Sequence, residues 1–228
     1  IEGCFPMGYL ATKATQGLIC SGNQSWAPLS FPNPLRISTT EECGLYGANL
    51  DSGWTGLFHR FDDWSGADGV YSIPFDGNEQ VSLQENKTLL VFSDTFVGEV
   101  DSASGYRIPP TVIINNSYAI LTGNLPIEEN IEFYYSYDED GNPESVFLPQ
   151  TENSQSGDWY WLMDGISIEQ KFYLFALRMD NGDNGNETFA IDGVSLLMFN
   201  VNDQDSIINL EQKETPLFYE DPEGFSIV

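Results

Sequence analysis

Hydrophobic positions recur along the chain in short runs, which polar turn sequences interrupt from Trp54 onward. Thr88–Ser93 and Lys171–Arg178 are nearly continuous apolar runs, which are typical of strands buried on both faces. No stretch of about 12 residues carries a clean apolar period of 3.6, so the pattern predicts no long helix. The chain is therefore expected to be all-β.

Shorter runs predict the remaining strands. Asp76–Asn78 and Asp138–Pro143 combine Asp, Gly, Asn and Pro, which favour tight turns between strands. Phe189–Val201 predicts one or two strands. The other predicted strands are Val70–Phe75, Thr111–Leu121, Ile131–Tyr137, Ser145–Leu148, Trp159–Met163 and Gly165–Ile168.

Two segments share one order of features: Asp-Gly, a short strand, a turn, a lysine and a buried strand. The first runs through Asp68–Ile73 and Lys87–Phe92, and the second through Asp164–Ile168 and Lys171–Ala176. A further strand follows each copy. Repeated hairpin units of this kind indicate β-propeller blades, whose innermost strands line a central channel. Asp68 and Asp164 are therefore expected at the start of such strands, near one channel mouth.

Acidic residues dominate the charge. The 228 residues include 8 Lys and Arg against 35 Asp and Glu, a net charge of −27. Such a chain repels nucleic acid and anionic membranes, since phosphate binding depends on Lys and Arg. A solvated acidic surface without a specific role is the simpler interpretation. No apolar run approaches the roughly 18 residues that a membrane span needs.

Residues 1–53 are irregular and hold all three cysteines, Cys4, Cys20 and Cys43. We interpret them as an N-terminal cap with one disulfide and one remaining thiol, its pairing left open, and 54–228 as the blades. Four N-x-S/T sequons, at Asn23, Asn86, Asn115 and Asn186, would accept glycans in a secretory host. The start does not look native, so a signal peptide is expected to have been removed and the protein secreted.

Five segments resemble a family of secreted five-bladed β-propellers, the DUF5005/DUF4185-like proteins, which are related in shape to furanosidase and glycoside hydrolase propellers. The segments are Gly53–Gly56, Ala67–Pro74, Thr88–Phe96, Asn115–Ile120 and Trp161–Ile166. The resemblance implies a five-bladed propeller and, by analogy, sugar chemistry. The chain carries strand units for about two and a half blades, so we expect it to cover part of a propeller, which a further chain or segment would complete.

Glycoside hydrolysis uses two carboxyl groups that flank the scissile bond. Asp68 is the candidate base or nucleophile and Asp164 the candidate acid. Asp94 ends an otherwise apolar strand, where a carboxylate must be paired, hydrogen-bonded or functional, and would orient its partners. The alternative is that Asp68 and Asp164 cap turns and Asp94 bonds to backbone amides.

The candidate substrate-binding residues are rarer side chains near these segments. His59 is the single histidine, and Arg107 could pair with a carboxylate or hold a sugar hydroxyl. Aromatic rings stack on sugars, although core packing is the alternative use. Arg178 is interpreted as a surface counter-charge. The full set is His59, Arg107, Asn116, Trp64 and Trp161.

The sequence implies no nucleotide cofactor, and a zinc cluster is disfavoured because there is a single histidine. Asp138–Asn142 and Asp180–Gly185 are rich in oxygen ligands but lack EF-hand spacing, so we interpret them as turns, with Ca²⁺ as the alternative. The predicted function is extracellular glycoside hydrolysis with paired aspartates and carbohydrate as partner. The alternative is a non-catalytic module that binds glycans or builds an extracellular assembly.

Overall fold

The computed structural model describes residues 51–78, 86–181, 189–220 and 226–227. The chain divides into two units, Ile1–Ser52 and Gly53–Val228, and nearly all described residues belong to the second. The predicted disulfide-bonded cap and its three cysteines lie outside the described residues. The sequons at Asn23 and Asn186 lie outside them as well.

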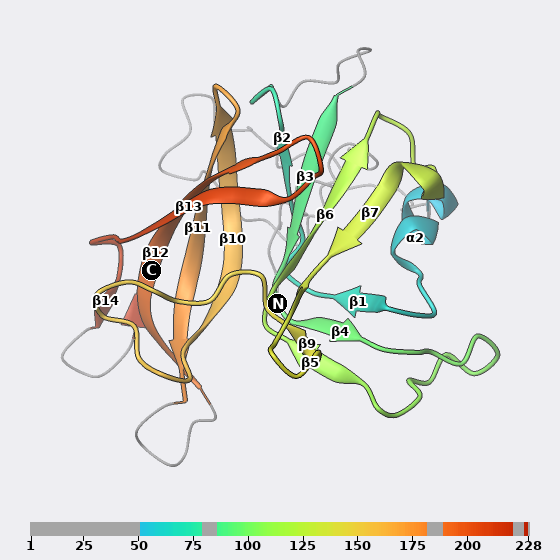
Figure 1. Ribbon diagram of the computed structural model, residues 1–228, viewed down its shortest axis with the longest axis horizontal. Helices are drawn as coiled ribbons and strands as arrows, with labels where there is room; N and C mark the ends of the chain where they lie inside the picture. The colour runs from blue at the N-terminus through green and yellow to red at the C-terminus, as the bar shows by residue number, and fades with distance from the viewer. Residues whose placement is uncertain (1–50, 79–85, 182–188, 221–225, 228) are drawn as a thin grey trace, which may run out of the picture. The chain divides into compact units, whose positions relative to one another are not determined.

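Two four-stranded antiparallel sheets form most of the second unit (Figure 1). The first contains, in spatial order, β2 (Tyr71–Pro74), β3 (Lys87–Phe92), β6 (Ser117–Thr122) and β7 (Ile131–Tyr134). The second is a meander of β10 (Trp159–Ile168), β11 (Lys171–Asp180), β12 (Ala190–Val201) and β13 (Ile207–Glu214).

The first sheet is covered on both faces at β3. Leu89 and Val91 join a hydrophobic cluster that includes residues of the second sheet. Leu90 and Phe92 join a separate cluster that includes Leu57. Successive side chains of a strand point to opposite faces, so a strand covered on both sides needs a continuous apolar run. The prediction from Thr88–Ser93 is confirmed.

The two sheets pack through their first strands, β2 and β10. Phe75 meets Phe172 edge-on at 4.9 Å between ring centroids, and Ser167 Oγ donates to the Phe75 carbonyl at 2.9 Å. A Cβ at Gly165 would lie 2.4 Å from the Tyr173 carbonyl oxygen, so glycine is required at this approach. The same stretch of β10 is irregular, since its pairing with β11 shifts between Leu162 and Gly165.

A third sheet contains β1 (Trp64–Ala67), β4 (Thr95–Val97) and β5 (Val112–Ile114), with β4 in the centre. Along the chain, the β4–β5 hairpin is inserted between β3 and β6, two strands that pair with each other. Thr95, Val97 and Ile114 are buried. The alternate side chains of β4 therefore project from the opposite face of this small sheet.

Smaller elements complete the described chain. α2 (Ser52–Phe58) is short and contributes Leu57 to the core, so the absence of long helices predicted from the sequence holds for the described residues. The remaining elements are a 3₁₀ turn (Glu128–Asn130), the pair β8 (Ser136–Tyr137) and β9 (Pro143–Glu144), and the pair β14 (Tyr219–Glu220) and β15 (Ser226–Ile227).

The all-β prediction is confirmed, and several of its details change. The predicted strand Ser145–Leu148 is wrong, Ile131–Tyr137 is two strands, β7 and β8, and the strands β1, β4 and β13 were not predicted. Thr111–Leu121 is two strands, β5 and β6, separated at Asn115 and Asn116. The two strands predicted around Asp164 are one, β10, which passes through the bulge without ending. Asp164 therefore lies inside a strand, and the expectation that it begins one is wrong.

Among the described residues, no helix is long and apolar enough to cross a membrane.

Candidate functional site

Asp68 and Asp94 face each other across the β1–β4 pair. The register pairs Gly66 with Phe96 and Ala67 with Thr95, and the next rung places Asp68 opposite Asp94. The Asp68 amide donates to the Asp94 carbonyl at 3.1 Å. Two aspartates 26 positions apart in the sequence are thereby brought to one rung of the sheet.

The Asp94 carboxylate is held by donors from two other strands. Trp161, on β10, donates its indole Nε1–H to Asp94 Oδ1 at 2.8 Å. Asn115, which follows β5, offers its amide nitrogen to the same oxygen at 3.5 Å. The register of β4 with β5 also places Asn115 opposite Asp94. Asp68, Asp94 and Asn115 thus form one polar row across the three-stranded sheet.

The environment of Asp68 favours its protonated form. Asp68 is exposed to solvent, but limited desolvation of its carboxyl group and the negative charge of Asp94 raise its pKa, and these effects exceed the opposing effect of a hydrogen bond from the Asp94 backbone N–H. A carboxyl group whose pKa is raised by a neighbouring carboxylate is a common arrangement in acid–base catalysis.

The opposite face of β4 is anchored by a chain of buried hydroxyls. Thr95 is fully buried and donates Oγ1–H to the Ser93 carbonyl at 2.8 Å. Its only hydroxyl proton is then used, so Ser117 Oγ–H must donate to Thr95 Oγ1, at 2.8 Å. Ser117 in turn accepts Trp64 Nε1–H at 3.1 Å. These hydrogen bonds hold Thr95 on the buried face of β4, so the neighbouring Asp94 projects from the opposite face.

Arg107 lies outside the three-stranded sheet, where its backbone bridges Val100, and its side chain reaches Phe96, two residues along β4 from Asp94. Its guanidinium carbon stands 3.6 Å from the centroid of the Phe96 ring, a close cation–π contact. A Cβ built on Gly66, the residue opposite Phe96, would lie 3.2 Å from Arg107 Nη2. Glycine at position 66 therefore leaves the room that the guanidinium occupies.

Asp164 stands apart from the aspartate pair. Its carboxylate is exposed and accepts the backbone N–H of Gly165 at 2.8 Å. In the described part of the chain, no contact joins it to Asp68 or Asp94. His59 is exposed as well, and its ring packs against Phe61 at 4.9 Å.

Trp64 and Asn116 hold the scaffold. Trp64 is 3 % exposed and stacks on Phe133 at 4.2 Å between centroids. Asn116 is completely buried, and its amide donates to the carbonyls of Phe147 and Tyr160 at 2.9 and 3.1 Å. Its oxygen accepts the Phe147 N–H at 2.8 Å. All polar atoms of these two side chains have partners inside the protein, so we leave both out of the proposed substrate contacts.

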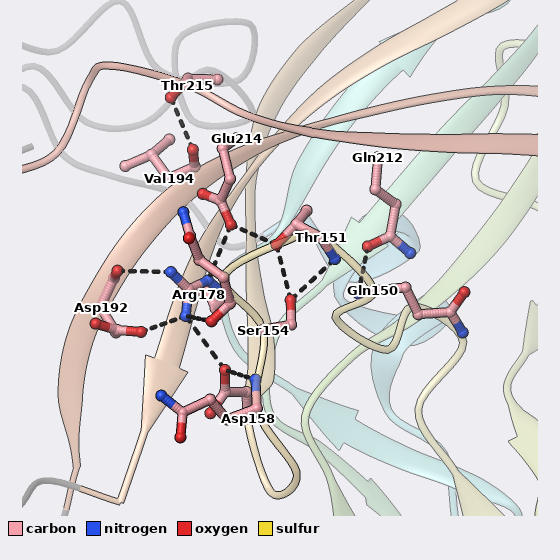
Figure 2. Close-up of polar contacts among 12 residues, drawn as sticks. Gln150, Thr151, Ser154, Asp158, Arg178, Asp192, Val194, Gln212, Glu214 and Thr215 are labelled. Atoms are coloured by element: carbon pink, nitrogen blue, oxygen red, sulfur yellow. Dashed lines mark hydrogen bonds and ion pairs between the residues drawn. The ribbon is translucent and has the colours of Figure 1, made fainter.

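The prediction for Arg178 is wrong, because this arginine is 2 % exposed rather than on the surface. Figure 2 shows its guanidinium among Asp158 at 3.2 Å, Glu214 at 3.3 Å and Asp192, which also accepts through its backbone carbonyl at 2.9 Å. Burial lowers the Arg178 pKa, but the charges of Asp192 and Glu214 outweigh burial and leave it raised. The period of two along β11 was the available signal, since Arg178 shares a face with buried residues at 172, 174 and 176.

The structure describes the first oxygen-rich loop, Asp138–Asn142, in full and the second only at its start. The Asp138 carboxylate accepts the side-chain amide of Asn142 at 3.0 Å and the backbone amides of Asn142 and Asp140 at 2.8 and 2.9 Å, which lower its pKa and close a turn. Most of the loop after Asp180 lies outside the described residues. In the described segments, no group of three or more His, Cys, Asp or Glu side chains is arranged to hold a metal.

The fold and the row of carboxylates define an all-β protein built on packed antiparallel sheets, with an acidic site on the open face of a small sheet. The chain belongs to the family described as "Domain of unknown function (DUF5005)", whose model matches residues 51–222. A search among curated proteins finds no match.

A solved structure shares the fold. It is a protein from Bacteroides ovatus ATCC 8483, described only provisionally as a hydrolase, with a TM-score of 0.54 and 18 % sequence identity. The similarity covers 71 % of this chain and 43 % of that protein, so the present chain spans less than half of its length.

Proposed function

We propose that this protein is a secreted glycoside hydrolase in which Asp68 and Asp94 are the two carboxyl groups. The observation that carries the proposal is the raised pKa of Asp68 directly opposite the Asp94 carboxylate. Glycosidases need one carboxylic acid and one carboxylate at the scissile bond, and the raised pKa makes Asp68 the candidate for the acid. Carbohydrate is the partner that such a pair would serve.

The raised pKa changes the role expected for Asp68 from base or nucleophile to acid, and Asp94 takes the role of base or nucleophile. Asp68, with its raised pKa, acts as general acid and transfers its proton to the glycosidic oxygen as the C–O bond breaks. Asp94 acts on the sugar carbon, either through a water that it deprotonates or as the nucleophile itself. Trp161 and Asn115 orient the Asp94 carboxylate through their N–H groups. Asp164 has no part in this step.

The similarity to a protein described as a hydrolase agrees with the proposal at the level of fold. The two four-stranded sheets, packed through their first strands, have the form of adjacent blades. We propose that they belong to a larger propeller, completed by a further segment or chain. A glycan-binding or assembly module is the alternative, and it would use the same open face without turnover.

Conservative substitutions at the pair test the proposal. Asp68→Asn and Asp94→Asn keep an oxygen that can accept the hydrogen bonds described, so the fold is expected to survive. Each should lower kcat/KM for oligosaccharide hydrolysis by roughly 10²- to 10⁴-fold. Asp164→Asn is the matched control and should stay within about twofold of the wild type.

The assay is release of reducing ends from a panel of plant, algal and animal oligosaccharides, followed across pH. Wild-type activity should fall as pH rises through the raised pKa of Asp68, because the acid loses its proton. Wild-type turnover that survives in both the Asp68 and Asp94 variants would exclude the pair. Binding of a glycan without turnover would favour the alternative module.

A further inference from the structure

Of the three arginines that the structure describes, Arg107 is the one with no carboxylate partner among the described residues. Arg60 pairs with Glu128 at 3.1 Å, and Arg178 is surrounded by three acids. Arg107 is exposed, and its one described side-chain contact is the face of Phe96. In a chain of net charge −27, an exposed arginine with no acidic partner among the described residues is a candidate to bind an anionic ligand.

The position of this guanidinium is fixed before any ligand arrives. The Phe96 ring supports one face of the planar group, and Gly66 leaves space for one of its nitrogens. Stacking of this kind does not consume the N–H groups, so the guanidinium donors remain available for a bidentate contact with an anion. An arginine held in place loses less side-chain entropy on binding than a free one.

Arg107 and the aspartate pair occupy the same face. Gly66 and Phe96 form the rung two residues from Asp68 and Asp94, about 7 Å along the strands at roughly 3.3 Å per residue. Asp94 and Phe96 project to the same side because Thr95 between them is buried. A sugar whose glycosidic bond reached the aspartates would therefore present a ring substituent to Arg107.

Resting on the proposed function, we infer that the substrate is an anionic glycan, in which a carboxylate or sulfate on the sugar next to the scissile bond binds Arg107. The acidic remainder of the protein does not prevent this. Charges in solvent are screened over about 8 Å at physiological ionic strength, so the nearest cation decides where an anionic group is accepted. The surrounding acids make other positions on the face unfavourable for that group, which fixes the orientation of the sugar.

Equilibrium binding measured by calorimetry separates this inference from catalysis. The probes are oligogalacturonate, oligoalginate and chondroitin sulfate hexasaccharides, each beside its carboxyl-reduced form and, for chondroitin, its desulfated form. Binding is measured in wild type and in the Asp68→Asn background. Since a hydrogen-bonded ion pair is worth roughly 10- to 100-fold in affinity, an acidic probe should bind that much more tightly than its neutral counterpart.

Arg107→Gln should abolish this preference, and Arg107→Lys should restore part of it without the bidentate contact. Arg60→Gln is the matched control, because Arg60 also lies over an aromatic ring, at 5.2 Å from Phe133, but is already paired with an acid. The control should keep the preference in full. If carboxyl reduction alone weakens binding, the group that Arg107 recognises is a uronate carboxylate. If desulfation alone weakens binding, the group is a sulfate ester.

Equal affinity for acidic and neutral probes, or a preference that survives in Arg107→Gln, would overturn the inference, as would failure of every acidic probe to bind. A preference that depends on Arg107 without bond cleavage in the wild type would refute the hydrolase and leave the anion site standing. Hydrolysis of neutral glycans, without tighter binding of acidic probes, would support the hydrolase and refute the anion site. The two proposals therefore fail separately.

Discussion

Removing the charge of Arg178 tests how the second sheet is held together. The arginine lies on β11 and contacts acids from three separate segments, Asp158, Asp192 and Glu214 (Figure 2). It also donates to the Asn153 carbonyl at 3.2 Å, which ties the loop before β10 to the sheet. Arg178→Met keeps an apolar stem of similar length and leaves three carboxylates without their counter-charge.

The expected loss is large because the partners are poorly solvated. The side chains of Arg178 and Asp158 are 3 % and 6 % exposed, so little water can replace the missing ion pair. Breaking a buried pair by removing one partner costs about 3–5 kcal/mol in the free energy of unfolding. For a domain of this size, that corresponds to a fall in Tm of roughly 6–20 °C.

Lys171→Met is the matched control. Lys171 also lies on β11 and pairs with Glu211 at 2.9 Å, but that pair is exposed to solvent. Its removal should leave the free energy of unfolding nearly unchanged, because solvent screens the pair. Urea unfolding at pH 7, with thermal unfolding alongside, measures both variants. Equal losses for the two variants would refute the reasoning.

Two further outcomes follow from the contacts of the aspartate pair. Trp161→Phe removes the N–H that orients Asp94, so kcat for glycan hydrolysis should fall about tenfold with KM little changed; an unchanged kcat would show that the bond at 2.8 Å does no orienting. Asp68→Asn should leave the protein at least as stable as wild type at pH 7. A raised pKa means that the folded state binds the Asp68 proton more tightly, so stability falls as pH rises from about 4 through the folded-state pKa. Thermal unfolding at pH 4 and pH 7 tests this, and a variant less stable than wild type at pH 7 would contradict the sign.

The local pattern of the sequence predicted the central strands of the two large sheets and, at β3, their burial. The continuous run at β3 predicts a strand covered on both faces, and its alternate residues do join two hydrophobic clusters. The pattern could not predict β10 as one strand, because a bulge and a glycine forced by the Tyr173 carbonyl interrupt the apparent period. A bulge interrupts the regular pairing of a strand without ending it, and it changes the hydrophobic pattern of the sequence only slightly.

The candidate site was predicted in part, since pairing between distant strands decides its composition. Asp68 and Asp94 were both candidates, but the sequence gives no measure of the register that places them opposite each other. The same uncertainty concealed Asn115, which reaches Asp94 only through the β4–β5 register. Trp64 and Asn116 were selected as rare polar or aromatic side chains, and burial gives them partners within the fold.

The internal repeat explains why the sequence pointed to Asp164. Both Asp-Gly pairs satisfy a demand of the backbone: Gly69 adopts φ +59° beside Ser93, and Gly165 is crowded by the Tyr173 carbonyl. The repeated glycine therefore marks positions where a side chain cannot fit. It gives no information about the function of the aspartate before it.

The two copies of the internal repeat, called the first and second unit here, differ at the seventh position after the lysine that both contain. Lys87 leads to Asp94 there, whereas Lys171 leads to Arg178. In the first unit, this position provides the carboxylate that raises the pKa of Asp68. In the second, a buried cation occupies it and is neutralised by three acids. An acid at the end of the buried strand is needed to build the pair, so the second unit cannot repeat the site, and Asp164 remains exposed without a partner carboxylate on the opposite strand.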